Sequence, residues 1–210
     1  MTRFFLVRHG ETEWNRVHRI QGSSDIPLND TGRAQALKVG GVLSRHRFDL
    51  IVASPLTRAM ETATIIARRL QMPLPLPLPA LVERHYGEAE GATRAELDAK
   101  FPGDTPVPGR EEREAVQKRV IRALGDLAIR HPHADIVAVT HGGVIRSVVD
   151  YAAPGQYNEP IRNCSVHSFL HSPGGVQLVE FDDPMETIAR KLATEDFVAQ
   201  NPSEARERAS

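Results

Sequence analysis

The sequence predicts an α/β fold, in the form of a doubly wound three-layer α/β/α sandwich around a mostly parallel sheet, with a small cap insertion. Three short apolar runs, residues 4–7, 49–54 and 135–140, are the first observation behind this prediction. Continuous apolar runs of this length are typical of parallel strands that are covered on both faces. Helical patterns separate the runs, and strands that alternate with helices indicate a doubly wound sheet.

Four helices are expected, over about residues 30–46, 54–70, 111–131 and 142–151. Three of them begin at a recognisable signal: an Asp–Thr pair, a Ser–Pro pair and a Gly–Gly pair, of which proline suits the first helical turn. The apolar positions expected to face the core are Ala34, Leu37, Val42 and Leu43 in the first helix, Ala59, Thr62, Ala63 and Ile66 in the second, and Val116, Val120, Leu124 and Leu127 in the third.

The other segments depart from this alternation. Residues 73–79 alternate proline with leucine, so they suit an extended edge segment, because proline cannot donate within a sheet. Residues 87–113 are rich in glycine, proline and charge and are expected to form the cap, and 165–182 suit a β-hairpin. We therefore expect one domain over 1–183, followed over 184–210 by an amphipathic helix and a flexible polar tail.

Composition excludes several classes of partner. The chain has 210 residues and a net charge of −1, so no overall charge attracts it to nucleic acid or to a membrane. Cys164 is the only cysteine, so no intrachain disulfide forms, and it is expected to be a small core residue. The N-terminus reaches charged residues too soon for a signal peptide, and no run is long enough to span a bilayer. A cytoplasmic monomer or homodimer is expected.

Three predicted strands end in residues that suit anion binding. The first is followed by Arg8 and His9, the second leads through Ser54 to Arg58, and the third is followed by His141. Ligands of open α/β sheets bind at the carboxyl ends of the strands, so these side chains are expected to meet in one crevice. Two arginines, two histidines and the amides of two helix N-termini suit a dianionic tetrahedral ligand. Neither the GxxxxGK[ST] nor the GxGxxG pattern occurs.

Further motifs extend this pattern along the chain. In chain order they are Leu6–Asn15, Gln21–Gly22, Pro27–Leu28, Thr31–Gly32, Ser54–Ala59, Glu83–Gly87 and Thr140–Gly143. With these motifs the chain resembles, over roughly residues 3–180, the histidine phosphatase superfamily of phosphoglycerate-mutase-like proteins, and within it the phosphatase branch.

The resemblance implies a catalytic role for five residues. His9 is the expected nucleophile, which forms a phosphohistidine. Arg8, Arg58 and a protonated His141 are expected to surround the phosphoryl oxygens, in place of a metal ion. Glu83 is the expected acid for the leaving oxygen and then the base for water. No metal and no cofactor are expected, because the spacing of the other histidines matches no zinc motif.

A second group of residues is expected to bind the phosphate or the rest of the substrate: Asn15, Gln21, Gly22, Gly142, Tyr86 and Arg94. Glu88 and Glu90 follow Glu83 closely in the sequence and are the alternatives for its role.

The fate of the phosphohistidine separates three hypotheses. A phosphohydrolase that cleaves monoesters of small metabolites is expected, because the cap is short and leaves the site open to water. A 2,3-bisphosphoglycerate-dependent phosphoglycerate mutase is the alternative, since Glu83–Gly87 and Arg94 look mutase-like, but no Arg–Arg pair follows Gly91 within the cap. A non-catalytic phospho-ligand binding protein is disfavoured by the complete catalytic set. The substrate stays open among sugar phosphates, phosphoglycerate and nucleotides, and the arginines of the cap region, Arg84, Arg94, Arg110 and Arg113, suit a second anionic group.

Overall fold

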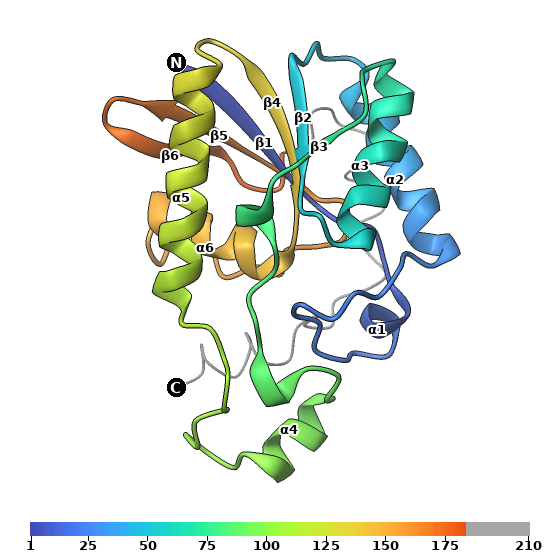
Figure 1. Ribbon diagram of the computed structural model, residues 1–210, viewed down its shortest axis with the longest axis vertical. Coiled ribbons are helices and arrows are strands. Elements are labelled where there is room, and N and C mark those ends of the chain that lie inside the picture. The colour runs from blue at the N-terminus through green and yellow to red at the C-terminus, as the bar shows by residue number, and fades with distance from the viewer. Residues whose placement is uncertain (184–210) are drawn as a thin grey trace.

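The computed structural model describes residues 1–183 and has a six-stranded mixed sheet at its centre (Figure 1). The strand order is β3-β2-β4-β1-β5-β6. The first four of these strands are parallel, and β5 and β6 form an antiparallel hairpin beside β1. The α/β prediction is therefore confirmed. The strands are β1 (Thr2–Arg8), β2 (Leu50–Ala53), β3 (Leu76–Pro77), β4 (Asp135–Thr140), β5 (Val166–Ser172) and β6 (Gly175–Glu180).

Helices cover both faces of the sheet, with α2 and α3 on one face and α5 and α6 on the other (Figure 1). The helix α4 lies apart from them, beyond the ends of the strands. The helices are α1 (Glu13–Arg16), α2 (Asp30–Leu43), α3 (Thr57–Leu70), α4 (Arg94–Lys100), α5 (Arg113–Arg130) and α6 (Gly142–Ala152), with short 3₁₀ turns η1 (Pro79–Leu81) and η2 (Gly87–Ala89).

The side chains of β1 alternate between the two hydrophobic cores. Phe4 and Leu6 pack in the core with the apolar stripes of α5 and α6. Phe5 and Val7 point to the opposite face and pack with α2 and α3. Successive side chains of a strand point to opposite faces, so an unbroken apolar run is what a sheet with two covered faces requires. Complete burial of each such side chain stabilises the fold by about 1.5–3 kcal/mol.

The predicted core positions of α3 and α5 are confirmed, but part of those in α2 are wrong. Leu37 is 57% exposed and Ala34 is exposed, whereas Ala36, Val39 and Gly40 are buried. Gly40 lies against α3, where an added Cβ would come within 3.1 Å of the Cβ of Arg69. The two helices therefore approach along a face of small residues, which the positions of the larger apolar residues did not reveal.

The start of α3 also differs from the prediction. The helix begins at Thr57, three residues after Ser54, and Pro55 lies outside it. Asp25 explains the difference, because its carboxylate accepts hydrogen bonds from the backbone N–H of Thr57 at 2.7 Å and from its hydroxyl at 2.6 Å. A side chain from a distant loop thus supplies the N-terminal cap of α3.

The connection from β3 to α5 contains a small core of its own. It holds η1, η2 and α4, and its apolar residues Tyr86, Ala89, Leu97, Phe101 and Val107 pack with Ile20 from the loop after α1. The predicted edge segment and the predicted hairpin are both confirmed, as β3 and as β5–β6.

The helix and tail predicted over 184–210 lie outside the described residues. Within residues 1–183, no helix is both long and apolar enough to cross a membrane.

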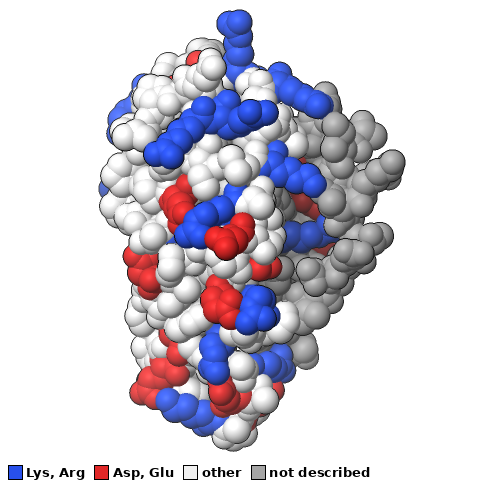
Figure 2. All heavy atoms as spheres, turned by 90° about the vertical axis from the view of Figure 1, so that its right-hand side faces the viewer, with Lys and Arg blue, Asp and Glu red and all other residues white. Residues whose placement is uncertain are grey.

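Positive and negative side chains intermingle over the lower part of the face that carries α2 and α3 (Figure 2). Arg33 in α2, for example, pairs with Glu61 in α3 and with Asp30 in its own helix. Such a pattern agrees with the net charge of −1.

Candidate active site

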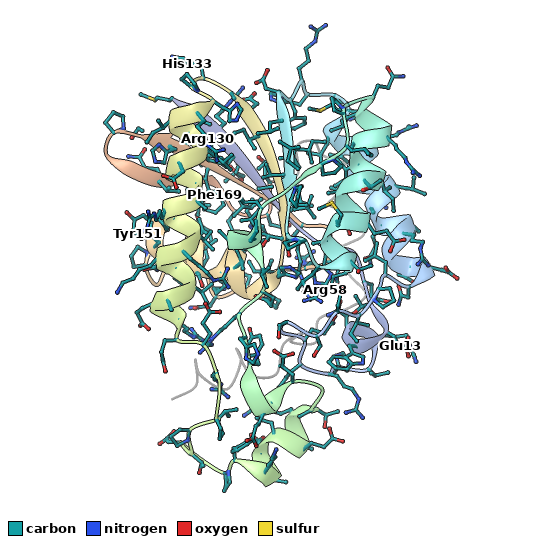
Figure 3. The ribbon with its side chains drawn as sticks, viewed as in Figure 1. Glu13, Arg58, Arg130, His133, Tyr151 and Phe169 are labelled. Carbon is teal, nitrogen blue, oxygen red and sulfur yellow. The ribbon has the colours of Figure 1, made fainter. Side chains whose placement is uncertain are left out.

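The side chains expected to bind phosphate meet at the carboxyl end of the parallel strands. His9 follows β1, Arg58 is the second residue of α3, and His141 follows β4 as the N-terminal cap of α6. Figure 3 labels Arg58 at this end of the sheet. These three side chains are at most 2% exposed, and Arg8 is 5% exposed. In the sequence, Arg58 lies 49 positions after His9, and His141 lies 132 positions after it. The carboxyl ends of the parallel strands bring these side chains together, as expected.

His9 is oriented as a neutral imidazole whose Nε2 lone pair accepts a hydrogen bond from Arg58. Its Nδ1 lies 2.7 Å from the carbonyl oxygen of Gly10, which can only accept, so Nδ1 carries the hydrogen. Its Nε2 faces Arg58, whose Nε lies 3.3 Å away. Burial, together with the charges of Arg58 and Arg8, holds the pKa of His9 well below its usual value. The ring is therefore unprotonated at neutral pH, as a nucleophile must be.

The loop of residues 22–24 holds Arg58. Its Nη2 donates to the carbonyl of Gly22 and its Nη1 to that of Ser24, each at 2.8 Å. Burial lowers the pKa of Arg58, and the carboxylates of Glu83, Asp25 and Glu90 oppose this effect. A guanidinium keeps its charge under these conditions, so the crevice holds a fixed cation beside His9.

Arg8 supplies a second cation. Its Nη1 donates to the carbonyl of Ile161 at 2.6 Å, in the loop before β5. Burial lowers its pKa to about 10, which leaves it charged at neutral pH. Gly142 lies beside this guanidinium, since a Cβ there would be 3.6 Å from Nε of Arg8.

The surroundings of His141 favour its neutral form, whereas a protonated ring is expected once phosphate is bound. Burial, followed by the effects of Arg58, His9 and Arg8, holds its pKa well below the usual value. Its ring centroid lies 5.1 Å from that of His9, and its Nε2 is 2.8 Å from the hydroxyl of Ser54. A dianion in the crevice would favour the protonated ring by direct attraction.

Several buried polar atoms of this region have no hydrogen-bond partner among the described residues. They are Nδ1 of His141, both amide atoms of Gln21 and Oδ1 of Asn163. Buried polar atoms are nearly always paired, so atoms of this kind mark places where a ligand or water binds.

Glu83 lies against the N-terminus of α6. One carboxylate oxygen accepts from the backbone N–H of Arg84 at 2.8 Å and the other from that of Gly143 at 3.1 Å. The side chain needs a glycine at 143, where a Cβ would lie 2.7 Å from Oε1. The charge of Glu83 acts on both Arg8 and Arg58, which puts this carboxylate in the same cluster.

Arg119 in α5 holds the segment that carries Glu83. It donates to the carbonyl of Ala80 at 2.5 Å and to that of Glu83 at 3.3 Å. Glu111 pairs with Arg119 at 2.9 Å and also accepts from the backbone N–H of His85 at 3.2 Å. This ion pair fixes the backbone on both sides of Glu83.

The two alternative carboxylates differ from Glu83 in their surroundings. The side chain of Glu88 is 54% exposed and pairs with Lys100 at 3.0 Å. Glu90 is bonded to the loop of Ser23 and Ser24. Among the three, Glu83 is the one at the N-terminus of α6.

The expected substrate-binding residues fall into two groups. Asn15 lies in the cluster, since its Oδ1 accepts from the side chain of Asn163 at 3.3 Å. Tyr86 is fully buried, and its hydroxyl would lie 2.9 Å from a Cβ on Gly143. Arg94, by contrast, begins α4 in the cap and donates to Asp98 one turn later at 2.7 Å. Its contact with substrate stays a prediction.

Sequence reasoning missed Asn163, which donates to the carbonyl of His9 at 2.9 Å. A signal was available, because β5 runs antiparallel to β1 and pairs Val166 with Val7. The residues just before β5 therefore lie beside the carboxyl end of β1. The neighbouring Cys164 is partly buried and packs against the core of α2 and α3, and burial raises its pKa to about 12.

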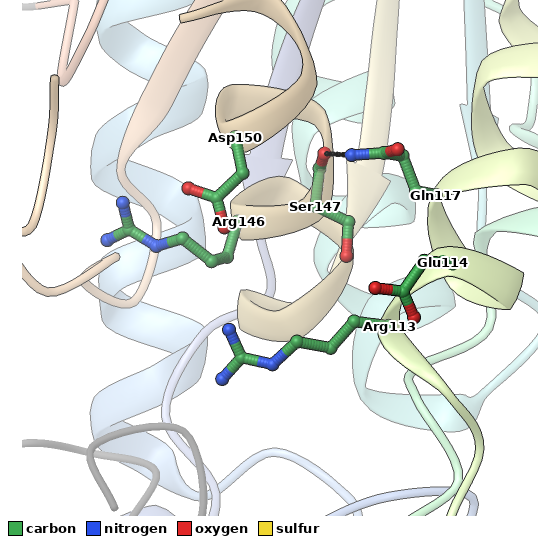
Figure 4. Close-up of a pocket in the computed structure, with 6 residues that line it drawn as sticks. All are labelled: Arg113, Glu114, Gln117, Arg146, Ser147 and Asp150. Carbon is green, nitrogen blue, oxygen red and sulfur yellow. Dashed lines mark hydrogen bonds between the residues drawn. The ribbon is translucent and has the colours of Figure 1, made fainter. Parts of the chain in front are cut away.

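A separate hollow lies between α5 and α6 (Figure 4). Its volume is about 160 Å³, and Gln117 donates across one side of it to the carbonyl of Ser147 at 3.2 Å. It does not include the cluster around His9. The residues that line it are Arg113, Glu114, Gln117, Arg146, Ser147 and Asp150.

Comparison with known proteins identifies the family. Residues 4–184 match the model of the histidine phosphatase superfamily (branch 1), and the chain belongs to this superfamily. It is 37% identical over 155 residues to the uncharacterized phosphatase PhoE of Bacillus subtilis (strain 168), across 74% of this chain and 79% of that protein. It is 38% identical over 177 residues to phosphoglycerate mutase-like protein 4 of Arabidopsis thaliana, across 78% and 77%.

The fold matches solved structures as well. The mycobacterial glucosyl-3-phosphoglycerate phosphatase Rv2419c, in a structure with VO3, superimposes with a TM-score of 0.76 at 28% identity, across 85% of this chain and 98% of that one. The relatives thus include phosphatases as well as proteins named for phosphoglycerate mutase.

Proposed function

We propose that this protein hydrolyses phosphate monoesters of small metabolites through a phosphohistidine intermediate on His9. The observation that carries the proposal is the state of His9: a buried, neutral imidazole whose Nε2 lone pair faces the guanidinium of Arg58. A neutral ring with a fixed tautomer is ready to attack phosphorus.

In the first step the dianionic phosphate binds among Arg8, Arg58 and the N-terminal amides of α6. The lone pair of His9 Nε2 forms a bond to phosphorus, and the bond from phosphorus to the ester oxygen breaks. The leaving oxygen keeps the electron pair of the broken bond and receives a proton from Glu83, whose protonated form the bound phosphate dianion favours. Because Nδ1 of His9 donates to the carbonyl of Gly10, this carbonyl stabilises the positive charge that develops on the ring.

His141 is the third positive group of the transition state. It is neutral before substrate binds, because of burial and the nearby arginines. The phosphate dianion raises its proton affinity, and the protonated ring then donates to a phosphoryl oxygen. The unpartnered Nδ1 is the atom suited to this bond.

In the second step Glu83, now a carboxylate, accepts a proton from water. The water oxygen attacks phosphorus, and the bond between phosphorus and Nε2 breaks and returns its electron pair to His9. Inorganic phosphate leaves, and Glu83 is again protonated for the next cycle. The positive charge comes from the side chains of the chain itself, so the proposed reaction needs no metal ion.

The second candidate is a 2,3-bisphosphoglycerate-dependent mutase, in which the phosphohistidine returns its phosphoryl group to a bound sugar acid. The mutase-like segment Glu83–Gly87 and relatives named as mutases, at 30% identity, favour it. The short cap, with its single seven-residue helix α4, favours access by water.

Product analysis separates the two candidates. Purified protein with EDTA is incubated with p-nitrophenyl phosphate and, separately, with 3-phosphoglycerate plus a trace of the bisphosphate. A hydrolase releases inorganic phosphate from p-nitrophenyl phosphate without interconverting phosphoglycerates, and His9→Ala abolishes the release. Interconversion of phosphoglycerates without release of phosphate would identify a mutase, and the absence of both activities would favour a binding protein. Activity that EDTA abolishes and magnesium or zinc restores would contradict the metal-free reaction.

A further inference from the structure

Glu90 is the most heavily hydrogen-bonded carboxylate described near the candidate site. One oxygen accepts from the backbone N–H of Ser23 at 3.0 Å, from its hydroxyl at 3.2 Å and from the backbone N–H of Tyr86 at 3.2 Å. The other accepts from the backbone N–H and the hydroxyl of Ser24, at 2.9 and 2.6 Å. The side chain is only 12% exposed. These five donors form an anion-binding site, and the carboxylate of Glu90 is the anion that occupies it.

The loop of residues 22–24, to which Glu90 is hydrogen-bonded, also binds Arg58. The carbonyls of Gly22 and Ser24 accept from the two terminal nitrogens of Arg58, while its Nε faces His9. Glu90 accepts hydrogen bonds from the backbone N–H groups of residues 23 and 24, which belong to the same short loop as the two carbonyls. A continuous series of hydrogen bonds therefore runs from Glu90 through the loop to Arg58 and His9.

The packing of Gly22 shows how closely the loop follows the carboxylate. A Cβ at this position would lie 2.1 Å from Oε1 of Glu90 and 2.9 Å from the carbonyl oxygen of Arg84. The backbone of the loop therefore rests directly on Glu90, without an intervening side chain. The position of the carboxylate determines where the carbonyl of Gly22 points.

The charge of Glu90 also reaches the site. Burial opposes ionisation of Glu90, but the hydrogen bonds from Ser24, Ser23 and Tyr86 outweigh it and hold its pKa below the usual value. The resulting negative charge, with those of Glu83 and Asp25, partly offsets the effect of burial on the pKa of Arg58. Because five donors from the loop and from Tyr86 bind its two oxygens, Glu90 is suited to holding the loop.

We propose that Glu90 is a positioning residue: it fixes the loop of residues 22–24 so that two carbonyls aim the guanidinium of Arg58 at the phosphoryl group beside His9. This inference rests on the proposed function. Tyr86 binds the same carboxylate through its backbone, so Glu90 also joins the cap to the phosphate-binding loop.

The test begins with Glu90→Gln, which keeps the shape of the side chain but removes its charge and turns one acceptor into a donor. Glu88→Gln is the matched control, because Glu88 lies two residues earlier and its half-exposed side chain pairs with Lys100, away from the loop of residues 22–24. The readouts are the single-turnover rate of phosphorylation with p-nitrophenyl phosphate and the inhibition constant of orthovanadate. We expect Glu90→Gln to lower the rate and the vanadate affinity by about tenfold or more, since loss of a single transition-state donor costs about 100- to 1,000-fold. Glu88→Gln should change both by less than about twofold.

A double-mutant cycle with Arg58→Ala identifies the route of the effect. If Glu90 acts through Arg58, then Glu90→Gln has little further effect on the residual rate of Arg58→Ala. Equal fold-losses in both backgrounds, or wild-type vanadate affinity in Glu90→Gln, would overturn the inference and leave the proposed function intact. A normal rate in Arg58→Ala would instead contradict the proposed function itself.

Ser24→Ala covers the case in which Glu90→Gln does not fold. It removes the 2.6 Å hydroxyl bond and keeps the backbone bond. We expect a smaller loss of the same kind, in rate and in vanadate affinity, that also disappears in the Arg58→Ala background. A Ser24→Ala protein with unchanged vanadate affinity would count against the inference.

Discussion

His167→Gln should remove a defined part of the pH dependence of stability. His167 is fully buried in β5, and its Nδ1 accepts from the backbone N–H of Asp182 at 3.1 Å. Its Nε2 therefore carries the hydrogen and donates to the hydroxyl of Ser165 at 2.9 Å. Burial, with a smaller effect of Arg146, lowers its pKa to about 3. Glutamine keeps a polar group at this place but does not titrate.

The magnitude follows from the difference between the folded and unfolded states. In the unfolded chain the pKa of a histidine is about 6.5, so below that pH the unfolded chain binds a proton that the folded protein does not. The contribution of His167 to the free energy of unfolding is fully present above about pH 6.5 and falls by about 1.4 kcal/mol for each unit towards the folded pKa. By about pH 4.5 the total loss, relative to a pH well above 6.5, is about 2.7 kcal/mol.

The assay compares urea unfolding of wild type and His167→Gln between about pH 7.5 and 4.5, in buffers without phosphate. Wild-type stability should fall more steeply, and the difference between the two curves should change by about 1.4 kcal/mol per unit below about pH 6.5. A constant change in stability caused by the substitution does not affect the slope. Parallel curves, or an NMR titration of His167 in the folded protein near pH 6.5, would refute the reasoning.

Three further predictions concern the site and the core. Glu83→Gln should slow phosphorylation by an alkyl phosphate at least about tenfold more than by p-nitrophenyl phosphate, because only the alkoxide needs a proton to leave; equal losses in the two burst rates would exclude Glu83 as the acid. Arg119→Met should lower the same alkyl burst rate several-fold through loss of its bonds to Ala80 and Glu83, and a loss of thermal stability without any change in this rate would contradict that role. Leu124→Ala, at a fully buried position of α5, should lower the free energy of unfolding by about 2–5 kcal/mol, as measured by urea titration, and should leave the turnover per folded molecule unchanged.

The positions of His9, Arg58 and His141 were predictable from the sequence because they follow strands. A parallel sheet brings the carboxyl ends of its strands to one edge, so a residue just after an apolar run has a known place. Asn163 obeys the same geometry with the strand direction reversed. The hydrogen bonds of Glu90 to residues 23 and 24 were not predictable, since they depend on the path of a loop with no periodic pattern.

The misplaced face of α2 and the late start of α3 have a similar cause. The approach of α2 to α3 depends on Gly40, and the beginning of α3 depends on Asp25, a residue 32 positions before Thr57. Both are contacts between segments distant in the chain, and local propensity does not encode them. Periodic patterns thus located the elements, whereas tertiary contacts set their faces and ends.

The most direct test of the account is to trap the phosphorylated protein during turnover. Wild type mixed with a phosphate monoester in EDTA is quenched within the first turnover, digested under alkaline conditions and analysed for phosphopeptides. We expect an acid-labile phosphoryl group on Nε2 of His9, formed at least as fast as phosphate is released and absent from His9→Ala. A label on another residue, or turnover at a near-normal rate in His9→Ala, would contradict the mechanism.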